Sequence, residues 1–405
     1  MSSRVRLEEM ASRTRALLEA VPEGAAPYVA VDGDVAAGAV RGSRTPPWTL
    51  GFWLGQLHLT EAVLPDPAVR HRLDAEQEQL CSLVLDRGPE FDHDLGFLMI
   101  LGPLADEQAG RGQGEPFGAG SRYRRPLQTA CEALAGRYNE RGHFLRAHGW
   151  EGSGGEHIDQ PGDNDGPAGR FIADTWMNLP LLLWGARAFD RPAWAQVALG
   201  HARTARELLT TADGWVLHGY EIDPATGERR GPSTIQGASP TSPWSRAQAW
   251  TVYGMELSAR MLGADGHLPR GGAELWRAEA AQLAAQFLAH SLPSGVAPWD
   301  FSMPQGDRTV PDTSASAIAL AALEGWAAVG SGAATAAEGM TDRAASLDAA
   351  LRPWSSPGRA GTGLLGGGCY YFPAGRGIDE PCAWGDYFWM EAAARRCGLT
   401  VPYDL

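Results

Sequence analysis

The chain of 405 residues has few cysteines, no basic run and no long apolar stretch. The five cysteines are odd in number and scattered, which argues against a disulfide framework and a CxxC metal site. They are Cys81, Cys131, Cys369, Cys382 and Cys397. No stretch of about 18 apolar residues occurs, so we expect no membrane-spanning helix. The N-terminal residues carry acidic groups and no apolar core of signal-peptide length, so we expect a cytoplasmic protein.

The net charge is −14 at pH 7. A surface with this charge repels nucleic acid, so we exclude nucleic acid as a partner. The same acidity would not attract a polyanionic sugar. An acidic substrate would therefore require cations concentrated at its binding site.

The sequence does contain helical periodicity. Its 51 glycines and 28 prolines lie mostly between the periodic segments, and it has 15 tryptophans. Apolar residues that recur every three to four positions predict amphipathic helices. We predict twelve, near residues 3–20, 49–62, 67–86, 94–107, 121–137, 172–190, 192–211, 245–262, 272–290, 313–329, 339–352 and 384–396. Most tryptophans are expected in the core, while some could line a cleft, because indole faces stack on sugars.

Twelve helices make six antiparallel hairpins, and no linker divides them, so we expect one all-α domain over residues 1–405. An open superhelical array and a closed toroid both suit this count, and the lack of a repeat of fixed period counts against the open array. Short β-hairpins are expected in the loops, with a strand–turn–strand at 215–231 and a strand at 142–148. Residues 151–169, rich in Gly, Asp and Pro, read as a flexible loop.

Two aspartates are candidates for chemistry, although each also suits a helix cap. Asp94 precedes an apolar helix, and Asp is a preferred N-cap residue. Asp174 stands shortly before Pro180, which is tolerated in a first helical turn, so the regular helix is expected to begin near Asn178. Ile172, Trp176 and Met177 would give Asp174 partly apolar surroundings, which raise a carboxyl pKa. Two carboxylates in different environments are the minimum set for acid–base chemistry on a glycoside.

The segment from Gln236 to Trp250 has the densest candidate chemistry. Arg246 and Trp250 are four residues apart and share a helix face. A guanidinium beside an indole could hold a carboxylate while the ring stacks on a sugar, although a surface Arg packed along a core Trp is common.

The histidines do not form a recognisable metal site. His218 lies in the predicted hairpin, and a lone His is more often structural than catalytic. A group of histidines and aspartates between residues 143 and 165 matches no tight ligand spacing, so we expect no metal. No P-loop, GxSxG or dinucleotide fingerprint appears in a suitable context.

Six stretches, in one order, resemble the unsaturated glucuronyl hydrolases of glycoside hydrolase family 88. They are Trp48–Trp53, His93–Phe97, Ile172–Leu182, Trp244–Tyr253, Asp312–Ala317 and Trp384–Tyr387. Each stretch alone would be a weak match, whereas six in order cover nearly the whole chain and form a specific signal.

The resemblance implies an (α/α)6 barrel, in agreement with twelve helices. It also implies that Asp174 is the general acid/base and Asp94 its partner carboxylate. The residues that would hold the uronic acid ring and its carboxylate are His93, His218, Gln236 and Arg246. The residues that would stack along the cleft are Trp48, Trp150 and Trp250. No metal or organic cofactor is implied, and we expect a monomer or weak dimer.

The implied substrate is an oligosaccharide whose non-reducing end is the 4,5-unsaturated uronic acid that a polysaccharide lyase leaves. Asp174 would protonate C4 of the enol ether and assist the addition of water at C5. The resulting hemiketal opens and expels the rest of the saccharide.

Two departures from the family pattern concern the cleft. Residues 151–169 are longer than the family loop and would reshape the cleft beside Trp150. Some relatives that accept sulfated fragments carry Ser-x-x-Ser-x-Lys near the C-terminus, where this chain has Tyr371–Arg376 and keeps only the cation.

Three alternatives stay open. An unsaturated rhamnogalacturonyl hydrolase of family 105 shares the barrel and both acids, but such relatives tend to carry Gly-Asn-Gly-Trp where this chain has the run Arg246–Trp250. Sugar epimerases use helical toroids with histidine bases, which the histidine placement here does not favour. A non-catalytic helical sugar-binding protein would keep its function when Asp174 is replaced by Asn.

Overall fold

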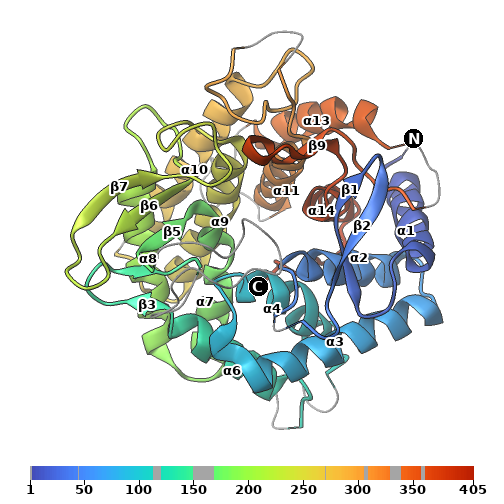
Figure 1. Cartoon of the computed structure of the whole chain (residues 1–405), viewed down its shortest axis with the longest axis horizontal. Helices are drawn as coiled ribbons and strands as arrows, with labels where there is room; N and C mark the ends of the chain where they lie inside the picture. The colour runs from blue at the N-terminus through green and yellow to red at the C-terminus, as the bar shows by residue number, and fades with distance from the viewer. Residues whose placement is uncertain are drawn as a thin grey trace.

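The computed structural model describes residues 2–43, 45–112, 120–148, 168–269, 271–304, 309–328, 339–356 and 361–405. Its helices form a closed ring with an inner and an outer layer (Figure 1). The inner layer holds α2 (Thr49–Val63), α4 (Leu95–Met99) with α5 (Ala105–Gln108), α7 (Leu179–Ala188), α9 (Ser245–Ala264), α11 (Thr313–Ala328) and α14 (Ala383–Arg396). The outer layer holds α1 (Ser3–Ala20), α3 (Pro67–Arg87), α6 (Arg124–Ala135), α8 (Pro192–Leu209), α10 (Gly272–Ala289) and α13 (Met340–Leu351). This alternation of outer and inner helices is the (α/α)6 barrel, so the expected fold class is confirmed.

Sequence explains which helices line the inside. Helix α2 has apolar or small residues on nearly every face, and almost all of its side chains are buried. Helix α8 buries one stripe that includes Trp194, Ala198, Ala202 and Leu209. A helix that is apolar all round belongs in the interior, and one with a single apolar stripe belongs on the surface. No helix in the described ranges is both long enough and apolar enough to cross a bilayer.

Two predicted helices differ from simple α-helices. The predicted helix 94–107 is interrupted by a π-helical turn at Ile100–Leu104 that contains Pro103. The predicted helix 172–190 begins instead as a 3₁₀ turn at Ala173–Met177, and the α-helix starts at Leu179, as Pro180 in its first turn requires. Asp174 therefore lies on a tight turn and not on a regular helix.

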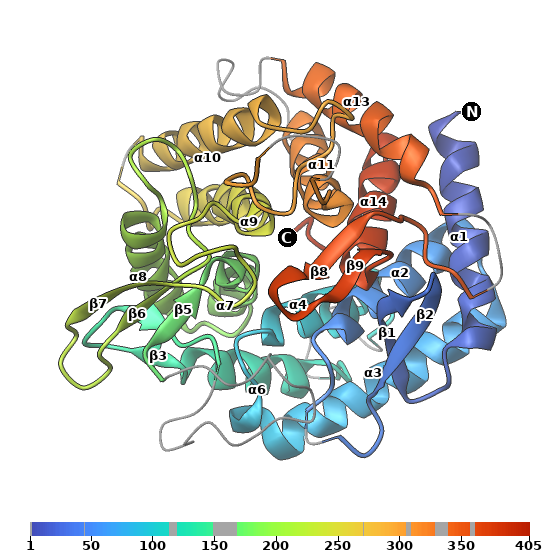
Figure 2. The same cartoon turned by 45° about the horizontal axis from the view of Figure 1, so that its top comes forward.

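Short antiparallel sheets lie in the loops at one end of the ring (Figure 2). They pair β1 (Ala25–Val31) with β2 (Asp34–Ala39), β3 (Tyr138–Asn139) with β4 (Phe144–Leu145), and β8 (Gly368–Tyr371) with β9 (Arg376–Glu380). A three-stranded sheet has the order β5 (Arg170–Ile172), β6 (Gly219–Ile222) and β7 (Arg229–Ser233). The predicted strands near 142–148 and 215–231 correspond to β4 and to β6–β7. The hairpins β1–β2 and β8–β9 and the strand β5 were not predicted.

Candidate active site

Asp94 occupies the N-cap position of α4, but its side chain makes no capping hydrogen bond. The cap comes instead from another helix, because the Phe97 N–H donates to Oδ1 of Asn178 at 2.8 Å. Asp94 Oδ1 lies 3.5 Å from Nε2 of His93, and the Asp94 side chain is 13% exposed. The carboxylate is thus placed where a cap would be, without serving as the cap.

Asp174 is the second residue of the 3₁₀ turn that follows β5, and the other residues of this turn, Ala173, Thr175, Trp176 and Met177, are buried. Its Oδ2 atom is buried and has no hydrogen-bond partner among the described residues. Burial raises the pKa of Asp174 from its ordinary value to about 6, against the opposing effects of the Arg246 charge and a backbone hydrogen bond. The protonated acid is therefore available close to neutral pH, as a proton donor requires.

The two aspartates are eighty residues apart in sequence, yet the structure ties their segments together. Nδ1 of His93, the residue before Asp94, lies 2.8 Å from Oγ1 of Thr175, the residue after Asp174.

Asn178 makes a second link between the segments. While its Oδ1 accepts from α4, its Nδ2 donates to the carbonyl of Asp174 at 3.3 Å. A Cβ on Gly96 would lie 2.4 Å from the Cα of Asn178, so only glycine allows this approach. Local sequence patterns do not indicate these roles for Thr175, Asn178 or Gly96, because each role depends on a partner in another hairpin.

Hydrogen bonds connect His218 and Gln236 to the segment of Asp174. The carbonyl of His218 accepts from the N–H of Ala173, next to Asp174, at 2.9 Å. Nδ1 of His218 accepts from the N–H groups of Ile235 and Gln236 at 3.2 and 3.3 Å. Burial lowers the pKa of His218 well below its usual value, so the ring is neutral and carries its proton on Nε2.

Arg246 is buried and is surrounded by acceptors. Its guanidinium pairs with Asp312 at 3.0 Å, donates to Oε1 of Gln236 at 3.0 Å, and donates to the carbonyls of Cys369 and Tyr370. It also lies over the rings of Trp244 and Trp384. The predicted contact of Arg246 with a substrate carboxylate stays a prediction, and the observed contacts show that this residue fixes Gln236 and strand β8.

The three predicted stacking tryptophans have different positions. Trp48 is half-buried, stacks on Trp384 with ring centroids 4.9 Å apart, and donates from Nε1 to the Tyr28 hydroxyl at 3.0 Å. Trp250 is fully buried, and its ring is covered by Phe52, Phe97 and Phe388. Trp150 lies outside the described residues, as do residues 151–167 of the predicted loop. A stacking role for these residues stays a prediction.

His148 also lies at the candidate site. In the sequence it stands out only as a member of the group of histidines and aspartates between residues 143 and 165, where we expect no metal. Its ring meets that of His93 edge-on at 5.5 Å, and it acts electrostatically on both His93 and His218. It is nine-tenths buried, and its Nδ1 has no hydrogen-bond partner among the described residues. Burial lowers its pKa to about 3, and burial lowers the pKa of His93 and His218 as well, so all three imidazoles are neutral at neutral pH. Within the described ranges, no three His, Cys, Asp or Glu side chains are grouped so that they could hold a metal ion.

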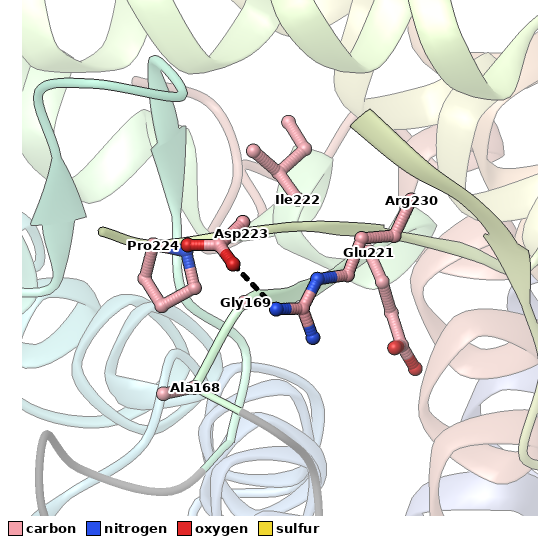
Figure 3. Close-up of a pocket in the computed structure, with 7 residues that line it drawn as sticks. All are labelled: Ala168, Gly169, Glu221, Ile222, Asp223, Pro224 and Arg230. Carbon is pink, nitrogen blue, oxygen red and sulfur yellow. Dashed lines mark hydrogen bonds and ion pairs between the residues drawn. The ribbon is translucent and has the colours of Figure 1, made fainter. Parts of the chain in front are cut away.

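A separate cavity of about 300 Å³ opens beside the β6–β7 hairpin (Figure 3). It is lined by Ala168, Gly169, Glu221, Ile222, Asp223, Pro224 and Arg230. Arg230 pairs with Asp223 at 2.5 Å, and Glu221 pairs with Arg170 at 2.8 Å, so both acids of this cavity already have a cationic partner. Neither Asp94 nor Asp174 lines it, and we do not assign the chemistry to it.

No family model matches the chain. Over 360 residues the chain is 31% identical to the unsaturated glucuronyl hydrolase of Bacillus sp. (strain GL1). The aligned part makes up 86% of this chain and 85% of that protein. The chain is 27% identical to the unsaturated chondroitin disaccharide hydrolase of Streptococcus pyogenes serotype M1, and the aligned part makes up 88% of this chain and 82% of that protein. The crystal structure of the unsaturated glucuronyl hydrolase from Bacillus sp. GL1 matches with a TM-score of 0.79 at 27% identity, over 99% of this chain and 98% of that chain. Identity of this extent, together with the shared fold, shows that the chain belongs to the unsaturated glucuronyl hydrolases, glycoside hydrolase family 88.

Proposed function

We propose that the protein releases the 4,5-unsaturated uronic acid from the non-reducing end of lyase-generated oligosaccharides by hydration of the C4=C5 enol ether. The observation that carries this proposal is a carboxyl group with a pKa of about 6, Asp174, held beside the segment of a second carboxylate, Asp94. Relatives support the substrate class. A solved structure that includes the saccharide dGlcA-Glc-Rha-Glc is 27% identical to this chain and matches it with a TM-score of 0.81.

In this proposal Asp174 donates its proton to C4, and the positive charge that develops is shared by C5 and the ring oxygen. The Asp174 carboxylate then accepts a proton from the water that adds to C5. The C5 hemiketal opens to a ketone, and the hemiacetal left at C1 breaks down to release the remaining saccharide. Asp94 would place the substrate.

The neutral ring of His218 supports a role in binding. Because Nδ1 accepts from backbone N–H groups, the Nε2–H is left to donate to a hydroxyl or carboxylate oxygen of the sugar. His93, Gln236 and Arg246 would complete the ring's surroundings, and Trp48 and Trp150 are proposed to stack along the cleft. Trp250, whose ring is fully buried against phenylalanines, would support the cleft from behind.

We also propose that the protein works in the cytoplasm as a monomer or weak dimer. All five cysteines are free thiols in the structure, which supports a reducing compartment.

A panel of unsaturated disaccharides tests the function. The panel contains lyase products of chondroitin, hyaluronan, heparin, gellan, ulvan and pectin, and the measured quantity is loss of the ultraviolet absorbance of the conjugated enol ether. We expect loss with at least one uronyl product. Loss only with the pectin-derived rhamnose-linked product would favour the rhamnogalacturonyl alternative, and no loss with any product would contradict the proposal.

A further inference from the structure

Asp300 is a fully buried carboxylate in the segment that follows α10. Its Oδ2 accepts from the N–H of Ala238 at 2.9 Å and from the hydroxyl of Ser242 at 2.7 Å. Its Oδ1 accepts from the N–H and the hydroxyl of Ser302 at 3.0 and 2.7 Å. These four donors are neutral, and their hydrogen bonds offset the cost of burying a carboxylate. The two oxygens of Asp300 therefore join two segments that are distant in sequence.

The two residues that donate to Oδ2 belong to the loop of residues 236–243, which leads into α9. A second bond between the two segments comes from the residue after Asp300, because the N–H of Phe301 donates to the carbonyl of Pro243 at 3.0 Å. The segment around Asp300 thus holds the loop both at its middle and at its end.

The residue before Asp300 holds the start of the loop. Trp299 is only 3% exposed, and its Nε1 donates to the carbonyl of Gln236 at 3.1 Å. Its ring packs against that of Phe372, with the centroids 4.4 Å apart. The carbonyl of Trp299 accepts from the N–H and the hydroxyl of Ser245, the first residue of α9, at 3.1 and 2.9 Å.

His218 holds the start of the loop from another element. Its Nδ1 accepts from the N–H groups of Ile235 and Gln236, and it also lies 3.0 Å from Oγ1 of Thr234. The same Thr234 oxygen accepts from the N–H of Gly237 at 2.9 Å. The backbone of Gln236 is therefore fixed between a residue of the candidate site and the segment around Asp300.

The side chain of Gln236 has one orientation that suits Arg246. A guanidinium group only donates, so the Gln236 atom that lies 3.0 Å from it is the acceptor Oε1. The amide NH₂ then faces away from the guanidinium, where it can donate to the carboxylate or a hydroxyl of the unsaturated ring. Hydrogen bonds weaken steeply with poor geometry, so this donor is useful only while the loop keeps its place.

We propose that Asp300 is a positioning residue for substrate binding, which holds the loop of residues 236–243 through Ala238 and Ser242 so that Gln236 meets the unsaturated ring. In this proposal Asp300 touches neither the substrate nor the reacting atoms. The inference rests on the proposed function, since Gln236 has a ring to meet only when the unsaturated uronic acid is bound at the two aspartates.

The test measures kcat and KM of Asp300→Asn with the member of the lyase-product panel that the wild-type protein consumes fastest. The amide keeps the shape of the side chain but replaces one acceptor oxygen with an NH₂ group that cannot accept. We expect KM to rise by about fivefold or more and kcat to change by less than about twofold, because binding geometry is lost while Asp174 stays in place. A merely structural role would lower the folded fraction, which reduces the apparent kcat and leaves KM unchanged.

Two serine variants separate the two oxygens of the carboxylate. Ser242→Ala removes the hydroxyl donor that belongs to the loop and should raise KM by about threefold or more. Ser302→Ala removes a hydroxyl donor to the other oxygen, from outside the loop, and should leave KM unchanged. Ser242→Ala is the milder change and decides the question if Asp300→Asn does not fold.

The outcomes for the inference and for the proposed function are distinct. An unchanged KM in the folded Asp300→Asn and Ser242→Ala variants, or an equal rise in Ser302→Ala, would overturn this inference alone. Wild-type inactivity on every member of the lyase-product panel would instead overturn the proposed function.

Discussion

At the scale of single residues, the two aspartates differ in how their environments act on them. Asp174 is held in a buried position, and burial is the largest cause of its raised pKa. Asp174 is thereby suited to carry a proton close to neutral pH. Asp94 stands at a helix N-terminus whose N–H groups favour negative charge. Asn178, and not Asp94, accepts the capping hydrogen bond from the N–H of Phe97.

The raised pKa of Asp174 predicts the direction of the pH dependence. If the protonated acid starts the reaction, kcat/KM should be high at low pH and fall as pH rises through about 6, where Asp174 loses its proton. A profile of kcat/KM between pH 4.5 and 8.5 measures this limb in the free enzyme. A value that rises through this range would contradict the assignment of Asp174 as the acid.

Gly96 gives a prediction about the placement of both acids. Gly96→Ala should push Asn178 away, because the new Cβ would meet its Cα at 2.4 Å. We expect a loss of about 2 kcal/mol or more in the free energy of unfolding, together with a fall in kcat beyond that caused by the unfolded fraction. Denaturant unfolding and kinetics below the transition provide the two measurements.

Gly120→Ala is the matched control, because a Cβ there meets no atom of the described residues within 4 Å. It should leave stability and kcat nearly unchanged. Equal behaviour of Gly96→Ala and Gly120→Ala would show that the contact between α4 and Asn178 does not place the acids.

At the scale of elements, helix periodicity was a sound guide because the barrel sorts its helices by apolar content. The hairpin β1–β2 was missed although it carries a readable signal. Asp32 and Gly33 both have positive φ, 52° and 81°, and Asp-Gly between extended segments is a typical two-residue hairpin turn. The surrounding alanines and glycine have low β-propensity and concealed it.

The arrangement of the site could be predicted only in part. The resemblance identified Asp94, Asp174, His218 and Gln236, and the structure brings their segments together. Local patterns could not indicate Asn178 as a cap for another helix or Trp299 as a support for Phe372, because both contacts join distant hairpins. The contact of Arg246 with a substrate carboxylate stays a prediction, and its hydrogen bonds to two backbone carbonyls could not be predicted, because they depend on where β8 lies.

At the scale of the whole molecule, the C-terminus returns to the middle of the ring (Figure 1). Tyr403 is fully buried there, near Phe388 and Tyr253. Asp404 pairs with Arg395 of α14 at 2.6 Å. The last residues thus fill space between the inner helices.

We predict that Tyr403→Ala destabilises the protein by about 3–5 kcal/mol, because it leaves a cavity where a whole aromatic side chain was buried. Denaturant unfolding measures the change. Phe372→Ala, which truncates an exposed aromatic, should cost much less and serves as the comparison. Similar costs for the two variants would show that the C-terminal residues do not support the barrel.

The measurement that tests the central claim most directly is the enol-ether absorbance with Asp174→Asn on a disaccharide that the wild-type protein consumes. The rate should fall by about 10³-fold or more, since the proton donor to C4 is gone. The variant should stay folded. The pKa of Asp174 is raised from 3.8 to about 6 in the fold, so its ionised form costs stability as pH rises through that range, by at most about 3 kcal/mol. Asn removes this cost, and the thermal midpoint at pH 8 should equal or exceed that of the wild type. A folded Asp174→Asn protein that consumes the substrate at the wild-type rate would contradict the account.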